Sequence, residues 1–268
     1  MRLDAELVRR GLARSRRQAG ELIAAGRVSV DGAPVLRAAA PVEVGRLLEV
    51  GDDPDDPGYA SRAGHKLAGA LDVWEPLGLT VAGRDCLDAG ASTGGFTDVL
   101  LRRGARHVVA VDVGHGQLRA QIAADPRVDA REGVNVRDLR AGDVDPTPAL
   151  VVADLSFISL RLVLAPLAAV AAPDADVVVL VKPQFEVGRE RLGSGGVVRD
   201  LAARRDAVLG VVAAAGEAGL TARDLVVSPL PGTDGNVEYF CWLRGPRAAG
   251  GTRLERERVD ELVLGGRS

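Results

Sequence analysis

Four charged residues have the types and the expected positions for proton transfer at a hydroxyl group. They are Lys66, Asp154, Lys182 and Glu238, placed where the ends of predicted strands meet. A hydroxyl is a weak nucleophile at neutral pH, so its reaction needs a base, or a cation that stabilises the developing oxyanion, and a lysine can serve as either. If Lys182 is desolvated and crowded by Lys66, it is neutral often enough to accept a proton, while the two carboxylates orient the ammonium groups. The same spacing would also suit two ordinary surface ion pairs.

A glycine-rich segment from Asp88 to Phe96 follows the first expected strand and opens a helix. Glycines at such a turn let the backbone approach a ligand and aim free amides at it, although the spacing departs from the Gly-x-Gly-x-x-Gly pattern of dinucleotide sites. Asp88 can hold the ammonium of a methionine moiety, and Asp112, which ends the second expected strand, can accept ribose hydroxyls. These carboxylates predict S-adenosylmethionine as the cofactor and argue against a pyrophosphate ligand.

Several of the expected cofactor residues also have a structural interpretation. Asp88 would suit the cap of the next helix, and Asp112 would suit the end of a strand. Asn135, which follows a presumed third strand and could touch adenine, is nearly as well suited to a turn. The full set expected to bind the cofactor is Asp88, Gly90, Ser92, Thr93, Gly94, Gly95, Phe96, Asp112, Asn135 and Asp154.

Apolar runs separated by helical segments, from about Gly64 onward, predict a doubly wound parallel sheet that positions these residues. Ligands bind at the carboxyl ends of the strands in such a sheet. The expected strands are Cys86–Asp88, His107–Asp112, Ala149–Asp154, Val177–Val181, Leu225–Ser228 and Val237–Leu243. Residues 229–235 are too few for a helical crossover, so the last two strands should be antiparallel. The predicted fold class is α/β, a Rossmann-like class I methyltransferase sheet with an antiparallel last strand.

A small, basic α+β domain precedes this sheet. Two short helices are expected, around Leu7 and from Ser15 to Ile23, followed by a strand that enters a hairpin at Asp31-Gly32. Eight arginines against four acidic residues give residues 1–37 a net charge of +4, although the whole chain carries −3. A run of basic residues usually forms a solvated face, but such a face also suits an anionic partner.

Composition and charge place the domain boundaries at an acidic linker. We expect the small domain at 1–51, the linker at 52–62 and the larger domain at 63–268. Cys86 and Cys241 lie in apolar runs, which predicts core packing and neither a disulfide nor a metal site. No apolar stretch approaches the roughly 20 residues that span a bilayer, so we expect a cytoplasmic protein with no membrane partner.

The small domain resembles the RNA-binding domain first named in ribosomal protein S-four. The resemblance is carried by Arg2-Leu3-Asp4, by residues 11–16, by Leu22-Ile23, by residues 26–28 and by Asp31-Gly32. It implies structured RNA as the partner, with arginines that neutralise phosphates and read the shape of the backbone. The arginines expected to bind RNA are Arg9, Arg10, Arg14, Arg16 and Arg17.

The larger domain resembles the TlyA family, also called hemolysin A, within the FtsJ-like ribose methyltransferases. The matching segments are 61–67, 88–96, 154–159, 182–187 and 235–240, and with the basic domain they cover nearly the whole chain. The resemblance implies 2′-O-methylation of cytidines in ribosomal RNA, of the large subunit and in some members also of the small subunit. It also implies that the family's Lys-Asp-Lys-Glu tetrad corresponds to Lys66, Asp154, Lys182 and Glu238.

Two segments bear on how far the resemblance extends. At the domain junction, Asp56-Pro57-Gly58-Tyr59-Ala60 stands where the family has an Arg-Ala-Trp-Val-like stretch. Residues 253–264 predict an added C-terminal helix, which resembles the longer members that act on both subunits.

Three other functions compete with methyl transfer. Pseudouridine synthesis also occurs behind this kind of RNA-binding domain, but it would leave the turn at 88–96 unexplained. A binding-only protein that assists ribosome assembly would not need Lys182. A membrane-active hemolysin is disfavoured, because only 3% of the residues are aromatic and no basic amphipathic helix with aromatic anchors is present in the sequence.

Overall fold

The apolar runs of the sequence form the strands of a seven-stranded sheet in the computed structural model, which describes residues 1–13, 15–51, 57–232, 234–248 and 252–265. The chain divides into two compact units, Met1–Gly58 and Tyr59–Ser268. Residues 52–56 of the expected linker lie outside the described residues, so the boundaries at 51 and 63 stay predictions.

The small unit contains the expected two helices and hairpin. Helix α1 is followed by α2, whose first turn is capped by Ser15 Oγ accepting from the Gln18 backbone N–H at 3.2 Å. Asp31 and Gly32 both have positive φ, 49° and 79°, as a two-residue hairpin turn requires. The elements are α1 (Leu3–Arg9), α2 (Arg16–Ala24), β1 (Val28–Val30), β2 (Ala33–Pro34) and β3 (Leu48–Val50).

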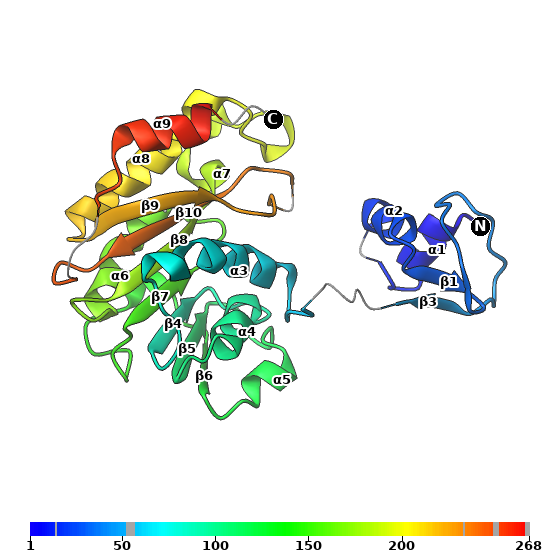
Figure 1. Ribbon diagram of the computed structural model, residues 1–268, viewed down its shortest axis with the longest axis horizontal. Coiled ribbons are helices and arrows are strands. Elements are labelled where there is room, and N and C mark those ends of the chain that lie inside the picture. Colours follow the sequence, from blue (N-terminus) through cyan, green and yellow to red (C-terminus); the bar gives the residue numbers. More distant parts are fainter. Residues whose placement is uncertain (14, 52–56, 233, 249–251, 266–268) are drawn as a thin grey trace. The chain divides into compact units, whose positions relative to one another are not determined.

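The larger unit confirms the predicted methyltransferase-type sheet. Its strand order is β6-β5-β4-β7-β8-β10-β9, and β10 runs antiparallel to both of its neighbours while β4 to β8 are parallel (Figure 1). The strands are β4 (Asp85–Ala89), β5 (His107–Asp112), β6 (Val128–Glu132), β7 (Leu150–Ala153), β8 (Asp176–Val181), β9 (Thr221–Val227) and β10 (Tyr239–Arg244).

Alternating strand residues build one apolar core on each face of the sheet. Leu87 and Val109 face the core that α6, α8 and α9 cover, whereas Cys86 and Val108 face the core beneath α3 and α4 (Figure 1). The longer helices are α3 (Arg62–Trp74), α4 (Gly95–Arg102), α6 (Leu164–Val170), α8 (Leu201–Glu217) and α9 (Arg256–Leu264). The short ones are η1 (Glu75–Leu77), α5 (Ala120–Ala123), η2 (Val136–Asp138), η3 (Leu160–Leu162), α7 (Pro183–Glu186), η4 (Arg189–Arg191) and η5 (Ser194–Gly196).

The boundaries of the last two strands differ from the prediction. Strand β9 begins at Thr221, four residues before the apolar run, because it lies at the edge of the sheet and tolerates polar side chains there. Strand β10 begins at Tyr239, so Glu238 precedes the strand and does not open it. The predicted C-terminal helix is present as α9, which packs Val259 and Val263 into the core beside α8.

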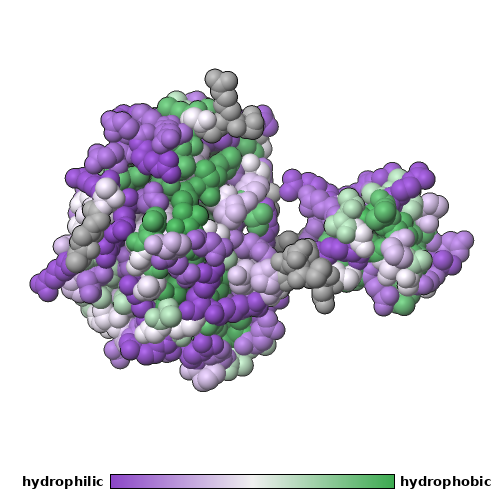
Figure 2. All heavy atoms as spheres, in the orientation of Figure 1, coloured by the Kyte–Doolittle hydropathy of each residue, from purple (hydrophilic) through white to green (hydrophobic). Residues whose placement is uncertain are grey.

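The visible face of the larger unit is mostly hydrophilic, with hydrophobic side chains gathered in a band across its centre (Figure 2). Exposed apolar atoms are common on folded proteins, so the band alone indicates no partner. Within the described residues, no helix is both long and apolar enough to cross a membrane.

We expect Leu71→Ala to lower the unfolding free energy of the larger unit by about 2–5 kcal/mol, because Leu71 of α3 is fully buried and truncating its side chain leaves a cavity. Val73→Ala, on the same helix at a position that is 48% exposed, should lower it by less than about 1 kcal/mol. Urea unfolding followed by tryptophan fluorescence reports on this unit alone, because Trp74 and Trp242 both lie in it. Equal losses for the two variants would contradict this packing.

Candidate functional site

The turn between β4 and α4 brings backbone close to the next strand. Gly90 and Gly94 have φ values of 88° and 92°, and Ser92 also has a positive φ, 46°. A β-carbon at Gly90 would lie 2.6 Å from the carbonyl oxygen of Asp154. Glycine is required here, both for the backbone conformation and for the close approach of the turn to the end of β7.

Asp112, at the end of β5, is held by the same turn. Its carboxylate accepts hydrogen bonds from the Ser92 backbone N–H (2.8 Å) and from the Gly114 N–H (2.7 Å). A shallow pocket beside it is lined in part by Ala91, Gln117 and Leu118. Two backbone amides therefore fix the direction of the Asp112 carboxylate. A carboxylate held in this way can accept hydrogen bonds from hydroxyl groups.

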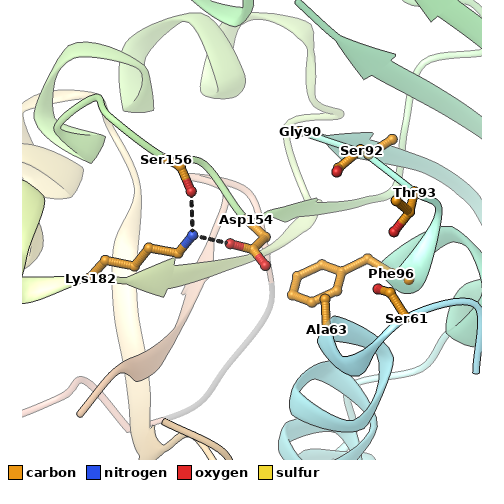
Figure 3. A pocket seen from close by; sticks show the side chains of 11 residues that line it. Ser61, Ala63, Gly90, Ser92, Thr93, Phe96, Asp154, Ser156 and Lys182 are labelled. Atoms are coloured by element: carbon orange, nitrogen blue, oxygen red, sulfur yellow. Dashed lines mark hydrogen bonds and ion pairs between the residues drawn. The ribbon is translucent and has the colours of Figure 1, made fainter. Parts of the chain in front are cut away.

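A cavity of about 150 Å³ lies between the glycine-rich turn and the ends of β7 and β8. Lys182, Asp154 and Ser156 lie on one side, and Ser92, Thr93 and Phe96 lie on the other (Figure 3). The remaining lining residues are Ser61, Ala63, Gly90, Ala91 and Gly95. The structure thus brings six of the predicted cofactor residues, five from the turn and Asp154 after β7, to one cavity together with one predicted catalytic lysine.

Lys182 is the cation of this cavity. Its Nζ lies 2.6 Å from Asp154 Oδ1 and donates a hydrogen bond to Ser156 Oγ at 2.8 Å (Figure 3). The residue is only 9% exposed. The ammonium is therefore aimed by two oxygen atoms and bounded by the Phe185 ring, whose centroid lies 5.9 Å away.

Lys66 and Glu238 form a second ion pair, with 2.6 Å between Nζ and Oε2. Both are buried, at 8% and 2% exposed, and Gln184 Nε2 donates to Glu238 Oε1 at 3.4 Å. These residues are not among those that line the cavity. The four predicted catalytic residues therefore form two pairs, one fully buried and one between buried Lys182 and half-buried Asp154, and neither is an ordinary surface pair.

Strand pairing explains why the pairs form at one edge of the sheet. Ala153 in β7 pairs with Val179 in β8, and Val181 pairs with Tyr239 in β10. Asp154 and Lys182 follow the ends of their strands, whereas Glu238 precedes its strand. Because β10 is reversed, its start meets the ends of the parallel strands.

Lysine usage is a signal in the sequence that spacing alone did not reveal. Lysine and arginine occupy 34 positions, and Lys66 and Lys182 are the only lysines among them. A guanidinium stays protonated in proteins, whereas an ammonium can lose its proton. Arginine occupies all of the other positions, so the two lysines coincide with the two cations of the predicted tetrad.

Asp88 lies behind the turn and is not among the residues lining the cavity. Its fully buried carboxylate accepts a hydrogen bond from Thr97 Oγ1 at 2.6 Å, and its Oδ1 has no hydrogen-bond partner among the described residues. Burial raises the pKa of Asp88 to about 7, and the nearby carboxylates of Asp154 and Asp112 add to the rise. Its contact with a methionine ammonium stays a prediction.

Asn135 has a local role. Its Oδ1 accepts from the Arg137 backbone N–H at 3.1 Å and caps η2, as a turn asparagine does. It does not appear among the residues lining either pocket, so its contact with adenine stays a prediction.

The predicted RNA-binding arginines of the small unit are largely paired with acidic side chains. The pairs are Arg9 and Arg10 with Glu6, Arg16 with Asp4, and Arg17 with Glu21. Arg14 lies outside the described residues. The sequence showed the excess of basic charge, but it did not show these pairs.

Two supporting residues escaped the sequence analysis. Ser156 contacts Lys182, and Asn236 is 1% exposed, accepts from the Val198 N–H at 2.9 Å and donates to the Gly196 carbonyl at 3.0 Å. Asn236 thereby ties the glycine-rich loop after β8 to the segment that carries Glu238. Both lie inside segments already matched to the family, and a serine or asparagine there gives no spacing signal of its own.

Across the described residues, no group of three or more His, Cys, Asp or Glu side chains could hold a metal ion.

We expect Asp88 to make stability depend on pH. Its pKa in the folded chain lies above the ordinary 3.8, so the folded protein keeps a proton that the unfolded chain loses, and its contribution to stability falls as pH rises from about 4 to about 7. The advantage of the native chain over Asp88→Asn in urea unfolding should therefore be larger at about pH 5 than at about pH 8. Asp72→Asn, an exposed position, is the control, and an advantage independent of pH would contradict the raised pKa.

Comparison with known proteins bears on both units. The family model of FtsJ-like methyltransferases matches residues 59–245, and that of the S4 domain matches residues 1–48. The 16S/23S rRNA (cytidine-2′-O)-methyltransferase TlyA of Mycobacterium tuberculosis is 55% identical over 91% of this chain and 89% of its own. Hemolysin A of Brachyspira hyodysenteriae is 37% identical over 90% of this chain and 98% of its own.

A solved structure supports the same assignment. A protein of Streptococcus thermophilus that is named as a hemolysin superposes with a TM-score of 0.77 at 35% identity, over 99% of this chain and 94% of its own. Similarity of this extent includes the small unit as well as the sheet. The chain therefore belongs to the TlyA family of FtsJ-like methyltransferases, which here carries an S4 domain before the methyltransferase domain.

Proposed function

We propose that this chain transfers the methyl group of S-adenosylmethionine to the 2′-hydroxyl of cytidine in ribosomal RNA of one or both subunits. The observation that carries the proposal is the cavity in which the glycine-rich turn faces the Lys182–Asp154 pair. The relative from Mycobacterium tuberculosis is named for this reaction on 16S and 23S rRNA. Because ribosomal RNA is the substrate, the proposed place of action is the cytoplasm.

The residues of the site fit S-adenosylmethionine. Gly90 and Gly95 line the cavity without side chains that would occupy it, and Asp112 presents a carboxylate fixed by two amides. These groups would hold the ribose and the chain of the cofactor, and Asp88 would attract its ammonium once ionised. When bound, the cofactor supplies a methyl group that is activated by its sulfonium sulfur.

Lys182 is the residue we assign to the hydroxyl. It lines the cavity, whereas Lys66 is engaged by Glu238 outside the lining. In its neutral form, Nζ of Lys182 would accept the proton of the 2′-hydroxyl, whose oxygen would take the methyl group that bound S-adenosylmethionine supplies. Asp154 and Ser156 Oγ hold Nζ in position, and Asp154 balances the positive charge that remains on the lysine.

The buried pairs favour catalysis over the alternatives. Burying an ammonium and a carboxylate is unfavourable unless both are paired, and a protein that only bound RNA would gain nothing from two such pairs beside a cavity. Pseudouridine synthesis leaves the glycine-rich turn and its cavity without a role. A membrane-active function likewise has no use for a cavity of this kind.

Gly90→Ala should weaken S-adenosylmethionine binding about tenfold or more, because its β-carbon would push the turn away from Asp154, and backbone there cannot yield as a side chain can. Gly83→Ala is the matched control. It places alanine at a similarly positive φ, 73° against 88° at Gly90, with no described atom within 4 Å of the new β-carbon. It should reduce stability by about 1–2 kcal/mol and leave cofactor affinity unchanged. Isothermal titration of both variants checks this, and equal affinities would contradict a role of the turn at Gly90 in cofactor binding.

Lys182→Ala should lower methyl transfer about 100-fold or more while leaving S-adenosylmethionine binding measurable. The measurement is transfer of labelled methyl groups to isolated 30S and 50S ribosomal subunits, with the label then mapped to ribose or base. Arg258→Ala, which removes a cation from an exposed ion pair on α9, should retain native activity.

Lys182→Arg separates the two roles of the lysine. A guanidinium keeps the charge but does not release its proton, so this variant should be about as inactive as Lys182→Ala. Near-native transfer by Lys182→Arg would rule out Lys182 as the base. It would leave Lys182 the role of a cation that stabilises the oxyanion. Label on a base, or no transfer to either subunit despite cofactor binding, would overturn the proposed function.

A further inference from the structure

Two buried carboxylates of the small unit each hold two arginines. Glu6 is 1% exposed and accepts hydrogen bonds from Arg9 at 2.6 and 2.7 Å and from Arg10 at 2.7 Å. Asp4 is 5% exposed and accepts from Arg2 at 2.9 and 3.1 Å and from Arg16 at 3.0 Å. Charge-assisted bonds of this kind give fixed geometry as well as attraction.

The position of Glu6 on α1 makes this arrangement rigid. Leu3 and Leu7 of α1 are fully buried, and Glu6 lies at the margin of that buried side, where packing limits its side chain. Arg10 is further fixed because its Nη1 donates to the Arg46 carbonyl at 2.6 Å. The hydrogen bonds from Arg9 and Arg10 lower the pKa of Glu6 to about 2, so the carboxylate stays ionised at neutral pH.

The carboxylates reduce the charge that the unit offers to an anionic partner. A surface that attracted phosphate by net charge alone would bind more strongly without them, because each cancels one positive charge. Any benefit of these carboxylates to RNA binding is therefore geometric. A guanidinium has five N–H donors, Glu6 engages the Nε and Nη2 edge of Arg9, and the Arg9 side chain remains 55% exposed.

We propose that Glu6 is a positioning residue of the RNA-binding surface, which sets Arg9 and Arg10 at a fixed separation to bind phosphates of a folded RNA backbone. Asp4 has the same role for Arg2 and Arg16. The inference rests on the proposed function, because it takes RNA as the partner. Arginines ordered before binding lose less entropy on binding, so this surface favours the regular backbone of helical RNA over a flexible strand.

The acidic residues also stabilise the fold, and the test must separate this role from the positioning of the arginines. Asp4 and Glu6 both lie in the first turn of α1, where a negative charge stabilises the helix dipole. A loss of RNA binding through unfolding would therefore imitate a loss of positioning. Thermal unfolding and far-ultraviolet circular dichroism of each variant provide that separation.

The experiment compares Glu6→Gln with Glu21→Gln in the full chain. Both changes remove one negative charge from the same unit, but Glu21 is exposed and pairs only with Arg17, at 3.3 Å, among its described ion pairs. Binding is measured to deproteinised 23S ribosomal RNA and to oligouridylate. Glu6→Gln should bind the folded RNA about tenfold more weakly than Glu21→Gln does, with no such loss for oligouridylate.

Glu6→Gln binding to folded RNA as tightly as Glu21→Gln would overturn the inference, because charge alone would then explain affinity. Native protein that shows no preference for folded RNA would overturn it as well. Failure of the proposed function appears elsewhere, as absence of methyl transfer by the native chain, and so the two failures are distinguishable.

The double variant Arg9→Lys/Arg10→Lys covers the case in which Glu6→Gln does not fold. It keeps both charges and removes the planar fork that Glu6 holds. It should lose affinity for the folded RNA while the affinity for oligouridylate and the dependence of binding on salt are retained. Undiminished affinity for folded RNA would show that positioned guanidinium groups are not needed.

Discussion

The reversed direction of β10 is the constraint on which the site depends. Parallel strands deliver the residues that follow them to one edge of a sheet, and β4, β5, β7 and β8 place Asp88, Asp112, Asp154 and Lys182 there or next to it. A parallel strand in this place would bring the residue after its end to this edge, and not the residue before its start. Because β10 is antiparallel, Glu238 arrives at this edge from the start of a strand and reaches Lys66 on α3. The second ion pair therefore follows from the topology.

Burial explains why each lysine needs a carboxylate at hydrogen-bond distance. A lysine that is about nine-tenths buried has lost most of its hydration, and only a partner at hydrogen-bond distance makes its charge tolerable. Lys182 has Asp154 and Ser156, and Lys66 has Glu238. The first pair holds its ammonium at the lining of the cavity, and the second pair holds Lys66 outside that lining.

The sequence predicted the sheet well because its signals are local or periodic. Apolar runs ended by Asp112, Asp154 or Lys182 are visible without a structure, and the short connection before β10 fixed its direction. The edge strand β9 was placed too late, because Thr221, Arg223 and Asp224 at its start are polar and not fully buried. Periodicity detects burial, so it fails where a strand is half exposed.

The site was less predictable, because contacts across the chain decide it. The tetrad came from resemblance, and spacing alone left open whether its members met at the surface or in a buried cluster. The full burial of Asp88 and its bond to Thr97 depend on how α4 lies on β4, which no motif encodes. The pairing of Asn236 with the backbone at Gly196 and Val198 joins segments 40 and 38 residues apart. Such contacts leave no periodic trace in the sequence.

Both units use a buried carboxylate to hold a cation, and the choice of cation differs with the task. In the small unit the cations are arginines, whose permanent charge and planar donors suit contacts with phosphate. Beside the cavity they are the two lysines of the chain, whose ammonium groups can exchange a proton. Because arginine serves everywhere else, the requirement for lysine at this site cannot be charge alone. Of the two kinds of cation, only an ammonium could take part in the proposed proton transfer, whereas a guanidinium suits the proposed contacts with phosphate.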